Sequence, residues 1–293
     1  MELSSYCMGC IARRQEEKIR DLPDEQNKSE FMKALFRAMG NAGPDDTAPV
    51  IASVAAELAF EYLGIKEDFK EEKKSFNALM RRHEKWIQKK IEGAQDPLLE
   101  ALKFARTGNY IDFGALKSVE QAQLEELLVQ AESDRVDEQE YIALLNDLKM
   151  GRSLVYLTDN CGEIVMDKLF IQEIQKYYPR IQVTVIVRGK SVMNDATMED
   201  AVEVGLTNTA KVLGNGCGAA GTPLSYISRE ALKEIEDADL IIAKGQGNFE
   251  SLNGCGRNVY YMFLCKCPWF VKRFQMKQFE GVLVNERNLQ KRA

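Results

Sequence analysis

The chain has 293 residues, of which 45% are hydrophobic and 29% charged, so it can bury a core in one large domain or two smaller ones. Its net charge of −6 at pH 7 argues against broad nucleic-acid binding, which requires a basic face. Because no apolar run approaches the roughly 20 residues of a membrane span and the N-terminus lacks the pattern of a signal peptide, we expect a cytoplasmic protein that does not bind membranes.

The first half of the chain is predicted to be helical. Apolar residues recur at helical spacing between 31 and 39, a nearly all-apolar helix is expected at 50–63, and a long charged helix at 69–91. The single histidine, His83, falls on that charged helix, where we expect a solvated face. Further helices are predicted at 11–19, 98–105, 119–131 and 138–148. We therefore assign residues 1–150 to an all-helical N-terminal region.

One loop interrupts these helices, with the sequence TGNYIDFG at 107–114. Glycines on both sides of Asn109 and Asp112 are typical of an ordinary connector that uses Asx-turn chemistry. The alternative is that the loop reaches the functional site, as loops on a rigid scaffold often do. On that hypothesis Asn109 and Asp112 contact the substrate.

After Gly151 the pattern changes to alternating strands and helices. Strands are predicted at 153–158, 182–187, 210–213, 240–243, 259–264 and 281–284, and helices at 164–178, 198–204, 228–235 and near Phe270. Alternation of this kind predicts an α/β domain over residues 151–293, with a mostly parallel sheet covered by helices on both faces.

Polar side chains follow four of these strands at the points where the strands end. Any one of them could be a turn former. Because ligands of open parallel sheets bind outside the carboxyl ends of the strands, we expect the whole set to meet at one edge of the sheet. Its members are Asp159, Asn160, Arg188, Asn194, Asp195, Asn215, Lys244 and Asn248.

The chemistry of this set favours phosphoryl transfer. Asp159, Asn160 and Asp195 offer three oxygen ligands, which suit a hard or borderline divalent ion and leave positions open for water and substrate. Lys244 is followed by Gly245 and Gly247, and its point charge with the nearby backbone amides suits a phosphate. Glu163 is either part of the catalytic group or a partner of the dipole of the helix that begins near it.

The sequence also suggests four alternative functions. The sequence GCGAAG at 216–221 matches the dinucleotide pattern G-x-G-x-x-G, but it lacks a strand-helix-strand start. A haloacid-dehalogenase-like phosphatase would need an aspartate at position 161, which is Cys161. A methyltransferase that uses S-adenosylmethionine would need a glycine-rich loop after the first strand. A non-enzymatic metabolite-binding or scaffold protein of the same fold is the opposing hypothesis.

The motifs TDNCGE at 158–163, Asn194-Asp195 and KGQGNFE at 244–250, together with CMGC at 7–10, resemble those of the metal-dependent damage-control phosphatase family, once catalogued as domain of unknown function 89. The branch that it resembles is the archaeal and bacterial one with an N-terminal Cys-x-x-Cys. The resemblance spans nearly the whole chain. It implies a helical region on a Rossmann-like three-layer α/β/α domain. It also implies hydrolysis of small phosphometabolites, such as damaged or surplus sugar phosphates, with Mg²⁺, Mn²⁺, Co²⁺ or Ni²⁺.

Carried over by position, the metal ligands of the family fall on Asp159, Asn160 and Asp195, and its phosphate-contacting lysine falls on Lys244. We add Glu163 to the catalytic group. The expected partner is a small-molecule phosphate ester. The remaining predicted site residues are expected to bind this substrate, and they are Arg188, Asn248, Asn109 and Asp112. The sequence leaves assembly into a homo-oligomer open.

Seven scattered cysteines without a secretion signal predict reduced thiols rather than a disulfide framework. Cys7 and Cys10 form one Cys-x-x-Cys, which is half of a tetrahedral zinc site. The pair Cys265 and Cys267 has the wrong spacing for the other half but could contribute. Buried thiols, a metal or redox role, and a place in the active site are all open for Cys7 and Cys10.

Overall fold

The computed structural model describes residues 1–110 and 135–289, so the helix predicted at 119–131 lies outside the described residues. The strands are β1 (Ser153–Leu157), β2 (Gln182–Val187), β3 (Lys211–Gly214), β4 (Leu240–Lys244), β5 (Val259–Leu264) and β6 (Gly281–Asn285). The first helices are α1 (Ser5–Ile19), α2 (Glu25–Gly40), α3 (Ala48–Leu63), α4 (Lys70–Gly93), α5 (Pro97–Thr107), the 3₁₀ turn η1 (Gly108–Tyr110) and α7 (Glu138–Met150). The later ones are α8 (Glu163–Tyr177), α9 (Met198–Glu203), the 3₁₀ turn η2 (Leu206–Asn208), α10 (Arg229–Asp237), α11 (Gly245–Leu252), α12 (Pro268–Phe274) and α13 (Glu286–Leu289).

Local signals explain where several of these helices begin. The side chain of Ser4 accepts a hydrogen bond from the backbone N–H of Cys7 and caps α1. Asp24, Asp96 and Asp137 cap α2, α5 and α7 in the same way. Because α1 starts at Ser5 rather than near position 11, both cysteines of the Cys-x-x-Cys lie on this helix.

The six strands form one sheet in the order β3-β2-β1-β4-β5-β6. Every neighbouring pair is parallel except β5 and β6, which are antiparallel. This arrangement confirms the predicted α/β class and the mostly parallel sheet. The chain runs outward from β1 to β3 and then returns to place β4 against β1, so the strand order reverses between β1 and β4. A crevice at such a reversal is the usual ligand site of an open α/β sheet.

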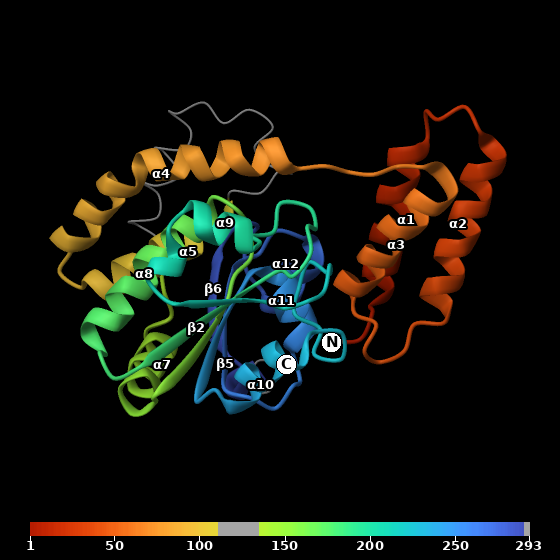
Figure 1. Ribbon diagram of the computed structural model, residues 1–293. Coiled ribbons are helices and arrows are strands. Elements are labelled where there is room, and N and C mark those ends of the chain that lie inside the picture. The colour runs from red at the N-terminus through yellow and green to blue at the C-terminus, as the bar shows by residue number, and fades with distance from the viewer. Residues whose placement is uncertain (111–134, 290–293) are drawn as a thin grey trace.

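Helices cover both faces of the sheet (Figure 1). Leu154 and Tyr156 of β1 belong to the core shared with α4, α5, α7 and α8, whereas Val155 and Leu157 belong to the core shared with α10, α11 and α12. In the second core, the ring of Phe249 makes edge contacts with four aromatic rings, those of Tyr261, Phe263, Phe270 and Phe274. The sheet is therefore the middle of three layers.

Helices α1, α2 and α3 pack on one another and form a bundle beside the sheet domain (Figure 1). An extended connection at 64–69 joins this bundle to α4. The apolar core of α4, α5 and α7, in contrast, is continuous with that of the sheet. The division of the chain into 1–150 and 151–293 stays a prediction, since the hydrophobic contacts run across residue 150.

Polar contacts tie the bundle to the sheet domain. The thiol of Cys7 lies 3.8 Å from Glu250 Oε1 on α11. In the loop before α10, the hydroxyl of Tyr226 donates to Asp46 Oδ1 at 2.5 Å and that of Ser225 to Asp45 at 2.8 Å.

Both edge strands of the sheet meet charged side chains. At the β6 edge, the backbone N–H of Asn285 donates to Glu140 Oε2 of α7 at 3.0 Å. At the β3 edge, the exposed Lys211 pairs with Glu234 of α10 at 2.7 Å.

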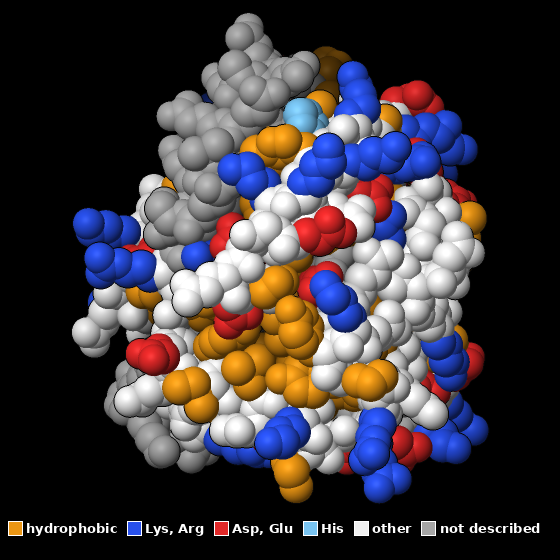
Figure 2. Space-filling view, turned by 90° about the vertical axis from the view of Figure 1, so that its left-hand side faces the viewer, with side chains coloured by type: hydrophobic (Ala, Val, Ile, Leu, Met, Phe, Trp, Pro, Cys, Tyr) orange, Lys and Arg blue, Asp and Glu red, His pale blue; other side chains and the backbone are white. Residues whose placement is uncertain are grey.

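Helix α4 carries an exposed band of Lys and Arg side chains, which Figure 2 shows as blue atoms near the single histidine, the half-buried His83. No helix among residues 1–110 and 135–289 combines the length and apolar character needed to span a membrane.

Candidate active site

Asp159 and Asn160 directly follow β1, and a segment that follows β2 lies against them. Asn160 and Asp195 form an isolated antiparallel bridge, and the N–H of Ala196 donates to the carbonyl of Asp159 at 2.7 Å. The backbone of Arg188 in turn donates to the carbonyl of Ala196 at 2.9 Å. Backbone hydrogen bonds therefore bring the three predicted metal ligands together, although these residues come from two different loops.

Arg188 holds the two carboxylates on either side of its guanidinium. Its Nε donates to Asp195 Oδ2 at 2.6 Å, and its Nη2 lies 3.6 Å from Asp159 Oδ1. Its Nη1 donates to Thr222 and to Asn248 Oδ1, both at 3.2 Å. Arg188 is 1% exposed, and its Nη2 makes no hydrogen bond with the residues that the structure describes.

Asn248 ties together the ends of the two central strands. Its amide nitrogen donates to the carbonyl of Thr158 at 3.0 Å and to that of Lys244 at 2.7 Å. Its Oδ1 accepts a bond from the Thr222 hydroxyl at 2.7 Å. The polar atoms of this side chain are thus bonded within the protein, and its predicted contact with the substrate stays a prediction.

The side chain of Lys244 is fully buried and is connected to the predicted metal ligands through Glu163. Its Nζ donates to Ala105 O at 2.7 Å, to Glu163 Oε1 at 2.6 Å and to Asp167 Oδ1 at 2.5 Å. Burial lowers the pKa of Lys244, but the charges of Asp167 and Glu163 outweigh it and hold the pKa above its usual value. An ammonium has three N–H donors, and protein oxygens use all three. Its predicted contact with a phosphate stays a prediction.

Glu163 begins α8 and connects Lys244 to the predicted metal ligands. Its Oε2 accepts bonds from the backbone N–H of Asn160 at 3.3 Å and from the Asn160 amide at 2.8 Å. The same Asn160 amide donates to Asp159 Oδ2 at 2.8 Å. Since Glu163 is also the acidic residue in the first turn of α8, both predicted roles are compatible with its position.

The loop after α5 reaches the site through Asn109. Its amide nitrogen donates to Asp159 Oδ2 at 2.8 Å and to Glu163 Oε2 at 3.2 Å. Its Oδ1 accepts the backbone N–H of Leu264, at the end of β5, at 3.3 Å. Asp112 lies outside the described residues.

Gly245 lets α11 begin directly against Asp159. Its φ of +79° falls in the left-handed region that favours glycine, and a Cβ at this position would lie 2.1 Å from Asp159 Oδ2. The helices predicted from the sequence include none over the KGQGNFE motif. The structure corrects this, since the helix α11 starts at Gly245.

The carboxylates repel one another strongly in this buried setting. Burial, followed by the charges of Asp195 and Glu163, raises the pKa of Asp159 to about 8, while Lys266 and Arg188 oppose the rise. The site combines four buried carboxylates with two buried basic side chains, so its formal charges leave an excess of two negative charges. These residues are Asp159, Glu163, Asp167, Asp195, Arg188 and Lys244.

The donor set fits a divalent cation. Carboxylate and amide oxygens are the ligands that Mg²⁺ and Mn²⁺ prefer, and one divalent ion would balance the excess charge. Among residues 1–110 and 135–289, no group of three His, Cys, Asp or Glu side chains is placed to hold a metal. The predicted set contains only two such residues, because its third member is the amide of Asn160.

Sequence reasoning missed two charged residues at this site. Asp167 lies four residues after Glu163 on α8, so the helical repeat places both on one face, and this spacing could have identified it. Lys266 follows β5, and the strand-end rule that selected Lys244 could have selected it too.

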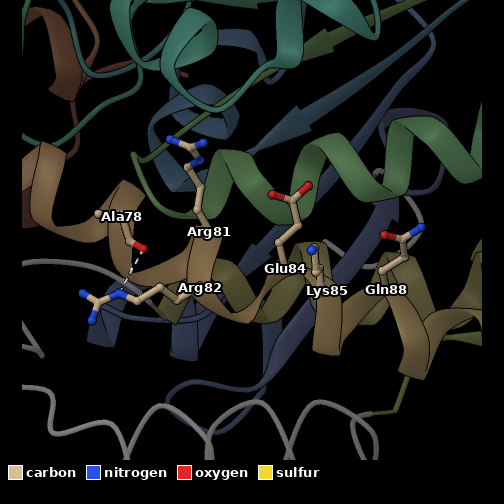
Figure 3. Close-up of a pocket in the computed structure, with 6 residues that line it drawn as sticks. All are labelled: Ala78, Arg81, Arg82, Glu84, Lys85 and Gln88. Atoms are coloured by element: carbon tan, nitrogen blue, oxygen red, sulfur yellow. Dashed lines mark hydrogen bonds between the residues drawn. The ribbon is translucent and has the colours of Figure 1, made fainter.

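The described residues also line a pocket on α4 (Figure 3). Its six lining residues all belong to that helix, and none is a predicted site residue. They are Ala78, Arg81, Arg82, Glu84, Lys85 and Gln88.

The fold and the site define a three-layer α/β/α protein with a buried, acidic cluster of oxygen ligands where the strand order reverses. The sequence profile of the damage-control phosphatase ARMT1-like domain matches residues 3–282, and the chain belongs to this family. Its place in the branch with an N-terminal Cys-x-x-Cys stays a prediction.

Relatives of the chain match it over most of their length. A protein of Pyrococcus horikoshii named damage-control phosphatase is 30% identical over 98% of this chain and 99% of its own length. One of Archaeoglobus fulgidus with the same name is 29% identical over 91% of this chain and 93% of its own length. The crystal structure of a domain of unknown function 89 family protein from Pyrococcus horikoshii superimposes with a TM-score of 0.82 at 25% identity, over 98% of this chain and 99% of that one.

Proposed function

We propose that the protein is a metal-dependent phosphatase that hydrolyses small phosphometabolites, either sugar phosphates or related damaged or surplus metabolites. The observation that carries this proposal is that Asp159, Asn160 and Asp195 lie together and that the guanidinium of Arg188 contacts both carboxylates. Membership of the damage-control phosphatase family supports the same chemistry.

In this proposal Asp159, Asn160 and Asp195 hold a divalent cation, which is Mg²⁺, Mn²⁺, Co²⁺ or Ni²⁺. The bound cation would polarise the phosphoryl oxygens and balance charge in the transition state. Amide donors from Asn109 and Asn160 both reach Asp159 Oδ2, so they fix the orientation of that carboxylate. Asp159 Oδ1 faces Arg188.

Arg188 is proposed to contact the phosphate through Nη2, because its other two nitrogens are bonded to the protein. Lys244 is proposed to position Glu163 by donating a hydrogen bond to it. Glu163 in turn accepts hydrogen bonds from the backbone N–H and from the side-chain amide of Asn160. Buried donors with fixed directions stabilise developing negative charge more than donors in water do. The site therefore combines one guanidinium aimed at the substrate with a rigid support beneath the metal ligands.

A phosphate-release screen tests this function. Purified protein is incubated with sugar phosphates and p-nitrophenyl phosphate in Mg²⁺, Mn²⁺, Co²⁺ or Ni²⁺, with EDTA as the control. We expect phosphate release from at least one sugar phosphate, and we expect EDTA to abolish it. Absence of turnover with every metal would contradict the proposal, and the non-enzymatic hypothesis would then stand.

A further inference from the structure

Helix α4 buries two polar side chains, those of Lys73 and Asn77, although most of its charged residues are exposed. The two residues lie on one face of the helix because they are one helical repeat apart. Helix α4 packs against both α8 and α9 (Figure 1). Each of these helices directly follows a segment that carries predicted metal ligands, so α4 lies beside both segments.

The oxygen of the Asn77 side chain contacts the first of these segments. Its Oδ1 accepts the backbone N–H of Gly162 at 2.7 Å, and this hydrogen bond is buried. Gly162 comes directly before α8, shortly after Asp159 and Asn160, and has a φ of +71°. A Cβ at this position would lie 3.4 Å from the side chain of Phe76. The turn that carries Asp159 and Asn160 is therefore seated against α4.

The nitrogen of the same side chain contacts the second segment. Asn77 Nδ2 donates to Asp200 Oδ1 at 2.9 Å and to Glu203 Oε2 at 3.0 Å, both on α9. The other oxygen of Asp200 accepts the backbone N–H of Thr197 at 2.8 Å and its hydroxyl at 2.7 Å, which caps α9. Thr197 closely follows Asp195 in the chain, so this contact holds the segment that carries the third predicted metal ligand.

The orientation of the Asn77 amide is fixed by its partners. Ionised carboxylates only accept hydrogen bonds, so the amide nitrogen faces Asp200 and Glu203, and the oxygen is left to face Gly162. Lys73 Nζ lies 2.7 Å from Asp200 Oδ2 and balances part of the negative charge there. Asn77 is thus a buried side chain with one possible orientation, which connects α4 to both segments at once.

Loss of this connection would leave a buried N–H of Gly162 without its acceptor and two carboxylates without a shared donor. Buried polar groups without partners are costly, so the segments would shift to regain them. Asp159 and Asp195 carry like charges, and a cation binds them more tightly when their positions are fixed in advance. A shift of either segment would therefore weaken binding of the cation.

We propose that Asn77 is a positioning residue for the metal site, because it holds both segments that carry the metal ligands in their places against α4. This inference rests on the proposed function, in which Asp159, Asn160 and Asp195 hold the cation. It assigns a role in metal binding to α4, a helix that contains none of the ligands.

The test compares Asn77→Leu, which removes the hydrogen bonds of the side chain but keeps its approximate volume, with the control Ile87→Ala. Ile87 is buried in the core on the same helix, about 15 Å further along at a rise of about 1.5 Å per residue. Its truncation leaves a cavity and lowers stability without removing a hydrogen bond. Asn77→Ala, which leaves room for a water molecule, replaces the leucine variant if that one does not fold.

Mn²⁺ is the probe, because it is one of the proposed cations and is paramagnetic. Its dissociation constant is measured by calorimetry, and the electron paramagnetic resonance spectrum of the bound ion reports the symmetry of its ligands. Thermal unfolding without metal gives the stability of each variant. Phosphate release at saturating Mn²⁺ is measured in parallel.

We expect Asn77→Leu to raise the dissociation constant of Mn²⁺ by about 10-fold or more and to alter the spectrum of the bound ion. Ile87→Ala should lower the melting temperature and leave both of these properties at their wild-type values. A purely structural role for Asn77 would likewise lower only the melting temperature. Wild-type Mn²⁺ affinity in Asn77→Leu, or an equal loss of affinity in Ile87→Ala, would overturn the inference and leave the phosphatase proposal intact.

Failure of the proposed function has a different signature. A wild-type protein that binds Mn²⁺ but releases no phosphate from any substrate would contradict the phosphatase proposal, and calorimetry on the variants would still decide the role of Asn77. A wild-type protein that binds none of the proposed cations would overturn the inference itself.

Discussion

Asp159 is the residue on which most contacts of the site converge. It receives amide donors from Asn109 and Asn160, faces Arg188, and lies against the backbone of Gly245. Each of these neighbours comes from a different part of the chain. A change at Asp159 therefore tests the whole arrangement.

Asp159→Asn and Asp195→Asn are expected to lose metal and activity while the protein stays folded. Each change keeps the volume of the side chain but removes one of the charges that attract the cation. Metal affinity should fall by about 10–100-fold or more, measured by calorimetry and elemental analysis. Asp21→Asn, an exposed carboxylate on the surface of the helical bundle, is the matched control. Wild-type metal content in both site variants would show that the ligands are placed wrongly.

Lys244→Met is expected to destabilise the protein as well as to inactivate it. The change leaves the Glu163 and Asp167 carboxylates buried without their shared cation. Breaking a buried ion pair by removing one partner costs about 3–5 kcal/mol, which a urea unfolding curve would detect. Adding Asp167→Asn should recover part of the stability. If Lys244→Met kept wild-type stability but lost activity, the phosphate contact predicted from sequence would be favoured instead.

At the scale of elements, the start of α11 decides whether Asp159 can adopt its position. Gly245→Ala would introduce a Cβ into the space of the Asp159 carboxylate and place alanine at a φ of +79°. Gly64→Ala is a close control, because Gly64 has a φ of +66° but no atom within 4 Å of its Cβ position. Both variants should lose about 1–2 kcal/mol through backbone strain.

Only Gly245→Ala should also lose metal binding and activity, because only its Cβ displaces a ligand. Unfolding curves and metal calorimetry on both variants separate strain from displacement. Equal metal affinity in the two variants would mean that the contact between α11 and Asp159 is unimportant for the site.

The elements themselves were largely predictable from the sequence. All six strands lie within one or two residues of their predicted positions, because buried parallel strands are short apolar runs bounded by polar residues. Helix α11 was not predicted, because two glycines in the first three residues, Gly245 and Gly247, are unfavourable for a helix, although glycine can also start a helix against a crowded neighbour.

The order of the strands in the sheet and the hydrogen-bond partners of the site residues were not predictable from the sequence. The strand order reverses between β1 and β4, but the sequence pattern showed only that polar residues follow the strands. The pattern likewise selected Lys244 by its motif, while the oxygens that saturate its ammonium come from α5 and α8. A residue type at a strand end indicates a site, and only the folded contacts show which donors are still available.

At the scale of the whole molecule, the α1–α3 bundle and the sheet domain meet at the far end of α11. Glu250 of α11 is half-buried there, beside the thiol of Cys7. Burial raises the pKa of Glu250 to about 7. Burial, with a smaller contribution from the charge of Glu250, also raises the pKa of Cys7 to about 11, so this thiol is not activated for attack at neutral pH. All seven cysteines lie among the described residues, and each is a free thiol there.

The raised pKa of Glu250 predicts a pH-dependent stability at this junction. The folded protein keeps its proton up to about pH 7, whereas the unfolded chain releases it near the ordinary value of 4.5. The free energy of unfolding should therefore fall as pH rises from about 4.5 to 7, by about 1.4 kcal/mol for each unit of pKa difference.

Glu250→Gln removes this titration and isolates its contribution. Relative to the wild type, the variant should be more stable at pH 8 than at pH 4.5, as measured by urea unfolding at both values. A difference between variant and wild type that does not change with pH would show that the pKa of Glu250 is the same in the folded and unfolded states.

The charged side chains at the two edges of the sheet limit how copies of the chain can associate. A bare edge strand is a template on which a neighbouring molecule can add a strand of its own, and this is how sheets aggregate. Here Glu140 takes a backbone donor of β6, and Lys211 places a charge on β3. Growth of one continuous sheet through several copies is therefore disfavoured at both ends. We therefore expect any association between copies of this chain to use surfaces other than the two edges of the sheet.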